Sequence, residues 1–340
     1  MSFTVHDPVS GNSLQLGADP QRNAETFGAR WQAGVLDLVG TPVDQATADH
    51  YELQWGESVG FQNFAQKNPQ AMQATPGKQM GWPRFFEEVR EMARHKSVRV
   101  FDAACGFGGL LDELFADPIP EGLIYLGADI HGSLANIKKP KSAAPGQITL
   151  MRWDIGEVLP VEEPFDVVIC RASIHHTREP HRTFDNLVSR LSRGGGRIAI
   201  SAYARKGNLR EAVDDGLRAV IKPLGPDVAM KIGRELALFG RALQRTGARV
   251  TIDENLEWLG IKAGEHPLQS LIYDHLLKCW WNDAFGEDYS AVVNYDWYHP
   301  TYAYRYAFDE LSGWFDKNHI QVNHSHSTSF QHFIDGTRKA

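Results

Sequence analysis

Cysteine is scarce in this chain of 340 residues, and its three copies stand far apart at Cys105, Cys170 and Cys279. The sequence contains no Cys-x-x-Cys pair and no cysteine–histidine spacing typical of zinc ligands. We therefore expect neither a disulfide framework nor a metal site. This cysteine usage is typical of a reducing compartment, so we expect a cytoplasmic protein.

Long apolar runs and an excess of basic residues are also absent. No apolar run reaches membrane-spanning length, and the polar residues 1–21 lack the apolar segment of a signal peptide. The formal net charge of −7 argues against a general nucleic-acid-binding protein. We expect neither a membrane nor a nucleic acid as partner.

Regular alternation of strand and helix patterns begins at residue 98. Hydrophobic residues make up 42% of the chain, which suffices for a sizeable core. Short β-branched and aromatic runs predict strands over residues 98–101, 123–128, 147–152, 165–170 and 197–203. Helical patterns lie between them, which predicts a parallel sheet with helices on both faces.

The segments outside this alternating region have different patterns. Residues 1–97 form a leader, for which we expect helices over 31–39, 46–65 and 84–95. Residues 205–306 form an insertion with helical stretches over 209–221, 227–246 and 267–281. A further helix over 309–318 and strands over 320–324 and 328–334 close the chain.

A glycine-spaced turn follows the first strand and precedes a helical pattern. It reads Asp-x-x-x-Gly-x-Gly from Asp102 to Gly108, and such a turn lets a ligand approach the backbone closely. Leu111 stands where the dinucleotide fingerprint has its third glycine, so that fingerprint is incomplete.

This motif and the order of elements resemble class I S-adenosylmethionine-dependent methyltransferases of the small-molecule type. The resemblance covers residues 98–203 and the terminal strands. It implies a seven-stranded Rossmann-like sheet formed by residues 98–204 and 307–340, with residues 205–306 as a helical cap. The leader would then be a lid over the cofactor or a buttress on the sheet, and Trp55 and residues 79–82 are the lid positions to test.

S-adenosylmethionine is the cofactor that the resemblance implies, and acidic residues at strand ends match its binding positions. Asp129 follows the second strand at the spacing expected of a ribose ligand. Asp154 matches the residue that binds the adenine amino group, with Ile130 and Ile155 enclosing the purine. The residues assigned to the methionine portion are Asp102, Ala104, Gly106, Gly108 and Arg171. Each acid taken singly is also explained as a helix cap.

Candidate catalytic residues follow the fourth strand. His175 and His176 lie in a loop that resembles a His-His stretch of ubiquinone- and tocopherol-pathway methyltransferases. A histidine there could accept a proton from the acceptor, because its ordinary pKa is near neutral pH. The alternative is that both histidines cap the following helix.

The insertion contains a second group of candidates, dense in aromatic and polar side chains. Such side chains line ligand pockets because they provide apolar area and directional hydrogen bonds together. The substrate candidates are Tyr273, Asp296, Tyr298, His299, Tyr302 and Arg305, with Tyr298 and His299 also considered for catalysis. The alternative is an aromatic cluster that fixes the cap to the sheet.

The leading functional hypothesis is methylation of a small metabolite at oxygen or nitrogen, in specialised metabolism. Two enzymatic alternatives stay open. One uses S-adenosylmethionine itself as substrate and cyclises or transfers its aminobutyrate chain. The other is RNA methylation, which predicts a basic face that the sequence lacks. A non-catalytic binding scaffold is a further alternative, and the sequence leaves open whether the chain forms a homodimer.

Overall fold

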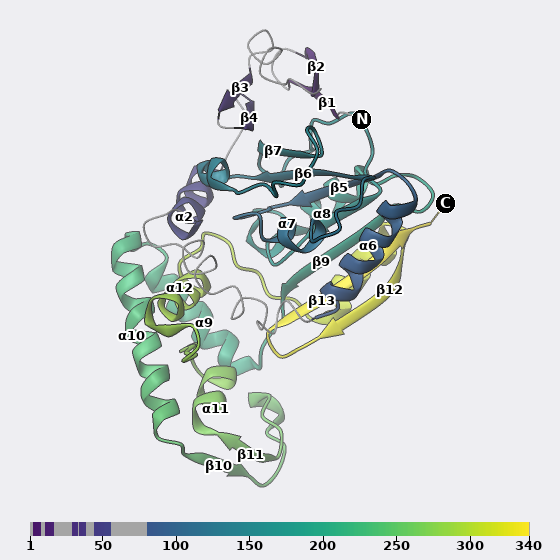
Figure 1. Ribbon diagram of the computed structural model, residues 1–340. Helices are drawn as coiled ribbons and strands as arrows, with labels where there is room; N and C mark the ends of the chain where they lie inside the picture. Colours follow the sequence, from purple (N-terminus) through teal and green to yellow (C-terminus); the bar gives the residue numbers. More distant parts are fainter. Residues whose placement is uncertain are drawn as a thin grey trace.

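A mixed sheet of nine strands, in the order β12-β13-β9-β8-β5-β6-β7-β4-β3, forms the centre of the computed structural model (Figure 1). The structure describes residues 3–7, 11–16, 29–32, 34–38, 44–55 and 80–339. The five central strands are β5 (Val98–Ala103), β6 (Leu123–Asp129), β7 (Ile148–Arg152), β8 (Val167–Cys170) and β9 (Arg197–Tyr203). They pair in parallel, so their carboxyl ends meet at one edge of the sheet.

The predicted closing elements complete the seven expected strands. Helix α13 (Phe308–Lys317) leads into β12 (Ile320–Ser327), and β13 (Gln331–Arg338) lies between β12 and β9. Both pairings of β13 are antiparallel. The alternating pattern and the terminal strand pair therefore predicted this part of the fold correctly.

The leader adds two strands to the other edge of the sheet. Strand β4 (Val35–Leu38) pairs in parallel with β7, and β3 (Ala29–Gln32) pairs with β4. The helix that we expected over residues 31–39 is therefore wrong. A short apolar run fits a helix or a strand equally well. Here residues 35–38 form a strand because they pair with the open edge of β7, and a turn at Gly34, with φ of 82°, separates them from β3.

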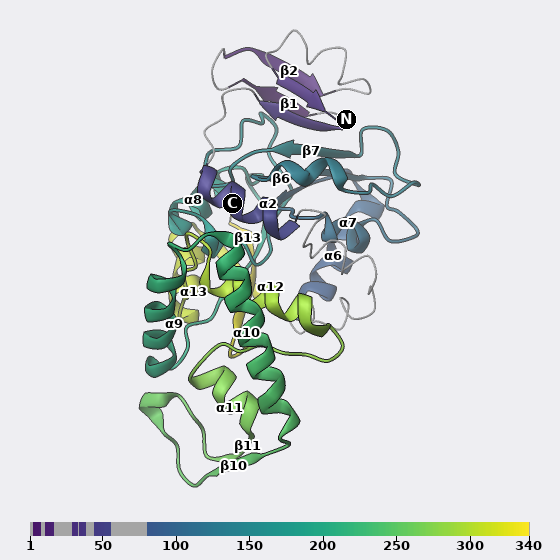
Figure 2. The ribbon, with the colours of Figure 1, turned by 90° about the vertical axis from the view of Figure 1, so that its left-hand side faces the viewer.

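The rest of the described part of the leader contains a hairpin and two helices, of which α6 (Trp82–His95) directly precedes β5. Strands β1 (Phe3–His6) and β2 (Ser13–Leu16) form a separate antiparallel pair. Helix α2 (Gln45–Trp55) lies beside the carboxyl edge of the sheet (Figures 1 and 2). The leader is therefore of mixed structure and not purely helical.

Helices cover both faces of the sheet, as an alternating pattern requires. On one face α6 (Trp82–His95) and α7 (Gly109–Leu114) pack through Phe85, Val89 and Leu111. On the other, α8 (Pro180–Ser189) and α13 pack through Phe184 and Phe315. Two apolar layers thus hold the central strands rigidly.

The insertion forms a mostly helical cap beside the sheet. It contains α9 (Asn208–Ile221), α10 (Pro226–Arg245), β10 (Arg249–Ile252), β11 (Gly264–Pro267), α11 (Leu268–His275) and α12 (Gly286–Tyr298). Helices α10 and α12 approach closely at Gly233, where an added Cβ would lie 2.6 Å from the carbonyl oxygen of Ala291. The hairpin β10–β11 is the part of the cap farthest from the sheet (Figure 1).

The insertion differs from the sequence-based expectation at three places. The helix expected over residues 267–281 ends at His275, the hairpin β10–β11 was not predicted, and the polar-aromatic segment contains helix α12. Aromatic residues on several faces of α12 hid its helical period, because the cap buries more than one of those faces.

None of the helices in the described part of the chain is both long enough and apolar enough to span a bilayer.

Candidate functional site

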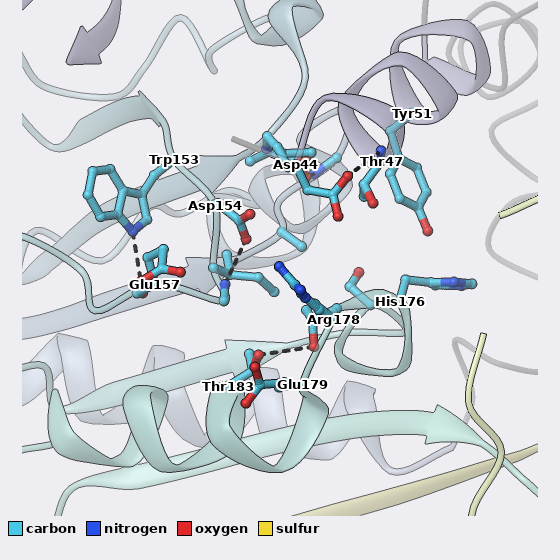
Figure 3. Close-up of a pocket in the computed structure, with 18 of the residues that line it drawn as sticks. Asp44, Thr47, Tyr51, Trp153, Asp154, Glu157, His176, Arg178, Glu179 and Thr183 are labelled. Carbon is cyan, nitrogen blue, oxygen red and sulfur yellow. Dashed lines mark hydrogen bonds between the residues drawn. The ribbon is translucent and has the colours of Figure 1, made fainter. Parts of the chain in front are cut away.

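A cavity of about 550 Å³ opens at the carboxyl ends of β5, β6, β7 and β8 (Figure 3). Open α/β sheets bind their ligands at this edge. Six of the nine predicted cofactor residues line it: Ala104, Gly106, Asp129, Ile130, Asp154 and Ile155. Helix α2 and helix α12 close it from the leader and from the cap, through Tyr51 and Asp296 among others.

The glycine turn after β5 is held in a left-handed backbone conformation. Ala104, Gly106 and Gly108 have φ of 64°, 55° and 82°. At Gly108 an added Cβ would lie 2.6 Å from the Ile137 side chain, so a larger residue does not fit. Ala172, at the end of β8, also has a positive φ of 53° and lines the same cavity. Two non-glycine residues in this region are unusual, and such strain concentrates at functional sites.

The carboxylate of Asp129 joins the glycine turn to the second strand. Its Oδ2 accepts a hydrogen bond from the Gly106 amide at 2.7 Å, and its Oδ1 accepts one from the Ile130 amide at 2.7 Å. Each carboxylate oxygen can accept a second hydrogen bond. Because Asp129 lines the cavity, those remaining lone pairs suit a diol such as a ribose.

Asp154 and the two isoleucines form the next part of the wall. The Asp154 Oδ1 accepts a hydrogen bond from the Gly156 amide at 2.8 Å, and burial raises the pKa of this carboxyl. Ile130 and Ile155 present apolar surface beside it. This combination of a flat apolar slot and an acceptor suits a purine with an exocyclic amino group, so the residues fit S-adenosylmethionine.

Three predicted cofactor residues lie behind the cavity wall. Asp102 is fully buried and accepts a hydrogen bond from the Tyr125 hydroxyl at 2.5 Å. Burial raises the pKa of the Asp102 carboxyl to about 7. Gly108 shapes the turn, and Arg171 forms an ion pair with Glu113 at 2.8 Å. These three residues support the lining residues from behind and do not line the cavity themselves.

His176 lines the cavity, and its tautomer follows from one contact. Its Nδ1 lies 2.7 Å from the carbonyl oxygen of Tyr302, and a carbonyl can only accept, so Nδ1 carries the hydrogen. Burial lowers the pKa of His176, which keeps the ring neutral and leaves Nε2 with a lone pair. His176 is thus equipped to accept a proton.

His175 lies behind His176 and does not line the cavity. Its ring is 3.8 Å from the ring of Tyr203 between centroids, and neither ring nitrogen has a hydrogen-bond partner among the described residues. Burial lowers the pKa of His175 well below its ordinary value. The pair therefore divides into a cavity histidine and a packing histidine.

Asp296 of α12 lines the end of the cavity beside His176. Its Oδ2 accepts a hydrogen bond from the Tyr203 hydroxyl at 2.9 Å, and its Oδ1 lies 3.7 Å from the His50 Nε2. Burial alone would raise the pKa of Asp296, but the neighbouring His50 and the Tyr203 hydrogen bond hold it below its ordinary value. Asp296 is therefore ionised.

The other cap candidates do not line the cavity. Tyr298 donates its hydroxyl to Asp214 at 2.9 Å, and Arg305 pairs with Glu211 at 2.8 Å and with Asp215. The remaining three make other contacts. The backbone carbonyl of Tyr273 accepts a hydrogen bond from Arg210, and the His299 Nδ1 lies 3.1 Å from the His50 Nδ1. The Tyr302 ring stacks on Tyr304. Tyr273, Tyr298 and Arg305 thus join cap elements to one another, His299 joins the cap to α2, and Tyr302 packs on its neighbour Tyr304.

Of the proposed lid positions, one side chain lies in the core, and two side chains cannot be placed at the cavity because they lie outside the described residues. Trp82 is fully buried and packs on Phe86 and Phe333. Gln79 and the side chain of Trp55 lie outside the described residues. The structure instead places other leader residues at the cavity, namely Asp44, Thr47 and Tyr51.

Sequence reasoning missed several lining residues, and one of them had a usable signal. Tyr203 is the last residue of the predicted fifth strand, so it ends at the ligand-binding edge like Asp129. Trp153 and Arg178 gave no comparable signal. Asp44 and Tyr51 are brought to the cavity by α2, whose position depends on tertiary contacts that the sequence does not express.

Acidic groups dominate the cavity. Six carboxylates line it, from Asp44, Asp129, Asp154, Glu157, Glu179 and Asp296, against the two guanidinium groups of Arg178 and Arg182. Arg182 lies 4.0 Å from Glu157 and 3.8 Å from Glu179, so its charge is shared with acids. Figure 3 shows the Arg178 side chain pointing into the cavity. This balance favours cationic over anionic ligands.

A family model described as a methyltransferase domain matches residues 101–197. Among curated proteins, a ubiquinone biosynthesis O-methyltransferase from Coxiella burnetii is 28% identical over 118 residues. That match covers 34% of this chain and 48% of the relative. The chain thus spans about half the length of the curated relatives it matches.

Methyltransferases are among the solved structures that are similar to this chain. A putative S-adenosylmethionine-dependent methyltransferase from Listeria monocytogenes is 12% identical, with a TM-score of 0.41, covering 76% of this chain and 97% of that one. The N-methyltransferase NodS from Bradyrhizobium japonicum is 9% identical, with a TM-score of 0.40, covering 87% of this chain and 100% of that one.

Proposed function

We propose that this chain, which carries a class I S-adenosylmethionine-dependent methyltransferase domain, methylates a small molecule at oxygen or nitrogen. The observation that carries the proposal is the cavity at the carboxyl ends of β5 to β8. It combines a ribose-type acceptor in Asp129, a purine slot and a neutral histidine in one space. The same cavity is also lined by Tyr51, Tyr203 and Asp296, and we assign this part of it to the acceptor.

His176 is the proton acceptor in this proposal. Its Nε2 takes the proton from the acceptor's O–H or N–H group, and Nδ1–H stays bonded to the Tyr302 carbonyl throughout. When bound, S-adenosylmethionine supplies an activated methyl group, whose carbon–sulfur bond breaks as the acceptor atom bonds to the methyl carbon, leaving S-adenosylhomocysteine. The chain's own contribution is alignment of the two reactants and removal of one proton.

Helix α2 serves as the lid in this account. Glu52 accepts hydrogen bonds from the amides of Gly132 and Ser133 at 2.7 and 3.1 Å, which ties α2 to the sheet side of the cavity. His50 contacts His299 and Asp296 and so ties α2 to the cap side. We assign residues 1–97 to the leader and lid, 98–204 and 307–340 to the cofactor-binding core, and 205–306 to the substrate cap.

Product analysis tests the proposed function. The chain is incubated with S-adenosylmethionine alone and with fractionated small-molecule extract, and the products are identified by mass spectrometry. We expect slow or absent turnover alone, and S-adenosylhomocysteine with a methylated compound when a fraction contains the acceptor. Methylthioadenosine released without any acceptor would instead support the alternative in which the aminobutyrate chain is cyclised.

A further inference from the structure

We propose that the acceptor carries a protonated amine, and that Asp296 binds this ammonium group at the end of the cavity walled by Tyr51, His176 and Tyr203. This inference rests on the proposed function and specifies its substrate class. The four residues come from α2, the loop after β8, the end of β9 and α12, so the leader, the core and the cap all contribute.

The Asp296 carboxylate has hydrogen-bonding capacity to spare. Its Oδ2 has one hydrogen bond, from Tyr203, and retains a second lone pair. Its Oδ1 is buried and lacks a hydrogen-bond partner among the described residues. The Asp296 side chain is 18% exposed and lines the cavity, although its Oδ1 is buried.

His50 does not satisfy the carboxylate by a hydrogen bond. The His299 Nε2 lies 3.0 Å from the Leu224 carbonyl, to which it must donate, so the His299 Nδ1 is an acceptor. The His50 Nδ1, at 3.1 Å, is therefore the donor to it. The His50 Nε2 faces Asp296 Oδ1 at 3.7 Å, beyond hydrogen-bond distance, so a protonated His50 acts on the carboxylate through its charge alone.

Three aromatic side chains, Tyr51, His176 and Tyr203, line the cavity together with Asp296. The Tyr51 and His176 ring centroids are 5.8 Å apart, and those of His176 and Tyr203 are 5.4 Å apart, both in edge-on arrangements. Figure 3 shows Tyr51 extending from α2 toward His176. Aromatic walls beside a carboxylate are the typical surroundings of a bound ammonium group, because the ring faces attract cations.

The charge of the whole cavity agrees with a cationic acceptor. An acceptor bearing a carboxylate or phosphate would meet six carboxylates and only two guanidinium groups. Arg182 lies at the start of α8 beside Glu157 and Glu179, and Arg178 belongs to the loop that also supplies His176. Among the described residues that line the cavity, carboxylates, Asp296 included, therefore outnumber guanidinium groups.

Three small probes of the same shape and different charge test the inference: 2-phenylethylamine, 2-phenylethanol and 3-phenylpropanoate. Each is titrated by ligand-observed NMR into the full chain saturated with S-adenosylhomocysteine. We expect the amine to bind at least tenfold more tightly than the alcohol, and the carboxylate not to bind. In Asp296→Asn the amine should bind no better than the alcohol, with the affinity for S-adenosylhomocysteine changed less than twofold.

Asp215→Asn is the matched control, because it removes the same charge from an exposed acid outside the cavity and should leave the amine preference intact. If Asp296→Asn does not fold, Tyr51→Leu replaces it, and we expect a severalfold loss of amine affinity.

The inference is overturned if the alcohol or carboxylate binds as well as the amine, if no probe binds, or if the preference survives Asp296→Asn. It is also overturned if Asp296→Asn weakens binding of S-adenosylmethionine but not of S-adenosylhomocysteine, since Asp296 would then face the sulfonium. Failure to bind S-adenosylhomocysteine at all would instead contradict the proposed function.

Discussion

Asp129 has two roles that a single side chain rarely combines. It accepts the amides of Gly106 and Ile130 and so holds the glycine turn against β6. It also presents its remaining lone pairs to the cavity. Removing this carboxylate therefore disturbs the turn and the ligand contacts together.

We predict that Asp129→Ala weakens binding of S-adenosylhomocysteine at least about 100-fold, because hydrogen bonds to a charged group are each worth about 1.5–3 kcal/mol. Isothermal titration calorimetry measures this affinity. Asp166→Ala is the control: its Oδ2 also accepts a backbone amide, from Arg99, but it lies outside the cavity. Equal affinity in Asp129→Ala and the wild type would refute the ribose assignment.

The buried histidines make stability depend on pH with a defined sign. Burial lowers the pKa of His175 and His176 in the folded state, so below pH 6.5 the unfolded chain binds more protons than the folded one. The stability that the two neutral histidines contribute to the folded state is present above pH 6.5 and is lost as the pH falls below it. Asp102 acts oppositely, because its raised pKa favours the folded state at low pH.

A variant isolates the histidine contribution from that of Asp102. We predict that His175→Phe reduces the loss of unfolding free energy between pH 6.5 and 5 by up to about 1.4 kcal/mol per pH unit. Urea unfolding at a series of pH values measures it. An unchanged slope in His175→Phe would show that His175 is not held neutral.

At the residue scale, the sequence predicted the placement of those residues that lie at the ends of strands. Asp129, Asp154 and the glycine turn were predictable because a parallel sheet brings the carboxyl ends of its strands to one edge. Tyr298 and Arg305 were harder to place, because a polar-aromatic residue on a cap helix is equally suited to a pocket and to a packing contact. Here the acids Asp214 and Glu211 of α9 engage them.

At the scale of elements, α2 is the piece whose position matters most to the cavity. It touches the core through Glu52 and the cap through His50. The sequence predicted this helix over residues 46–65; its described part spans Gln45–Trp55, and residues 56–65 lie outside the described residues. Its docking site could not be predicted, because the contacts involve residues about 80 and 250 positions away.

We predict that Glu52→Ala releases one end of α2 and weakens binding of S-adenosylhomocysteine about tenfold. Hydrogen exchange of residues 44–55 should become faster in the presence of this ligand. Asp49→Ala is the control on the same helix, since Asp49 accepts a hydrogen bond from Gln45, which belongs to α2 itself. Unchanged affinity and exchange in Glu52→Ala would contradict the lid assignment.

At the scale of the whole molecule, the sheet carries the residues proposed to bind the cofactor, and the helical cap completes the far end of the cavity. The sheet was predictable in topology because its strands alternate with helices, while the edge strands β3 and β4 were not. The packing of α10 on α12 positions Asp296, and it depends on close approach at Gly233. The hairpin β10–β11 makes no contribution to the cavity lining.

We predict that residues 249–267, which include this hairpin, can be replaced by a two-residue turn with less than a twofold change in affinity for S-adenosylhomocysteine. The ends of this segment are adjacent, because the Leu268 amide donates to the Ala248 carbonyl at 2.9 Å. Gly233→Val is the contrasting variant and should impair probe binding at Asp296, because it separates α10 from α12. Loss of cofactor binding in a folded deletion variant would contradict the division into core and cap.

A crystal structure of the full chain with S-adenosylhomocysteine tests the central claim most directly. The account predicts the adenine between Ile130 and Ile155, the ribose hydroxyls within hydrogen-bond distance of Asp129, and the sulfur directed toward His176. Density for the ligand outside this cavity, or with its adenine at the Asp296 end, would contradict it.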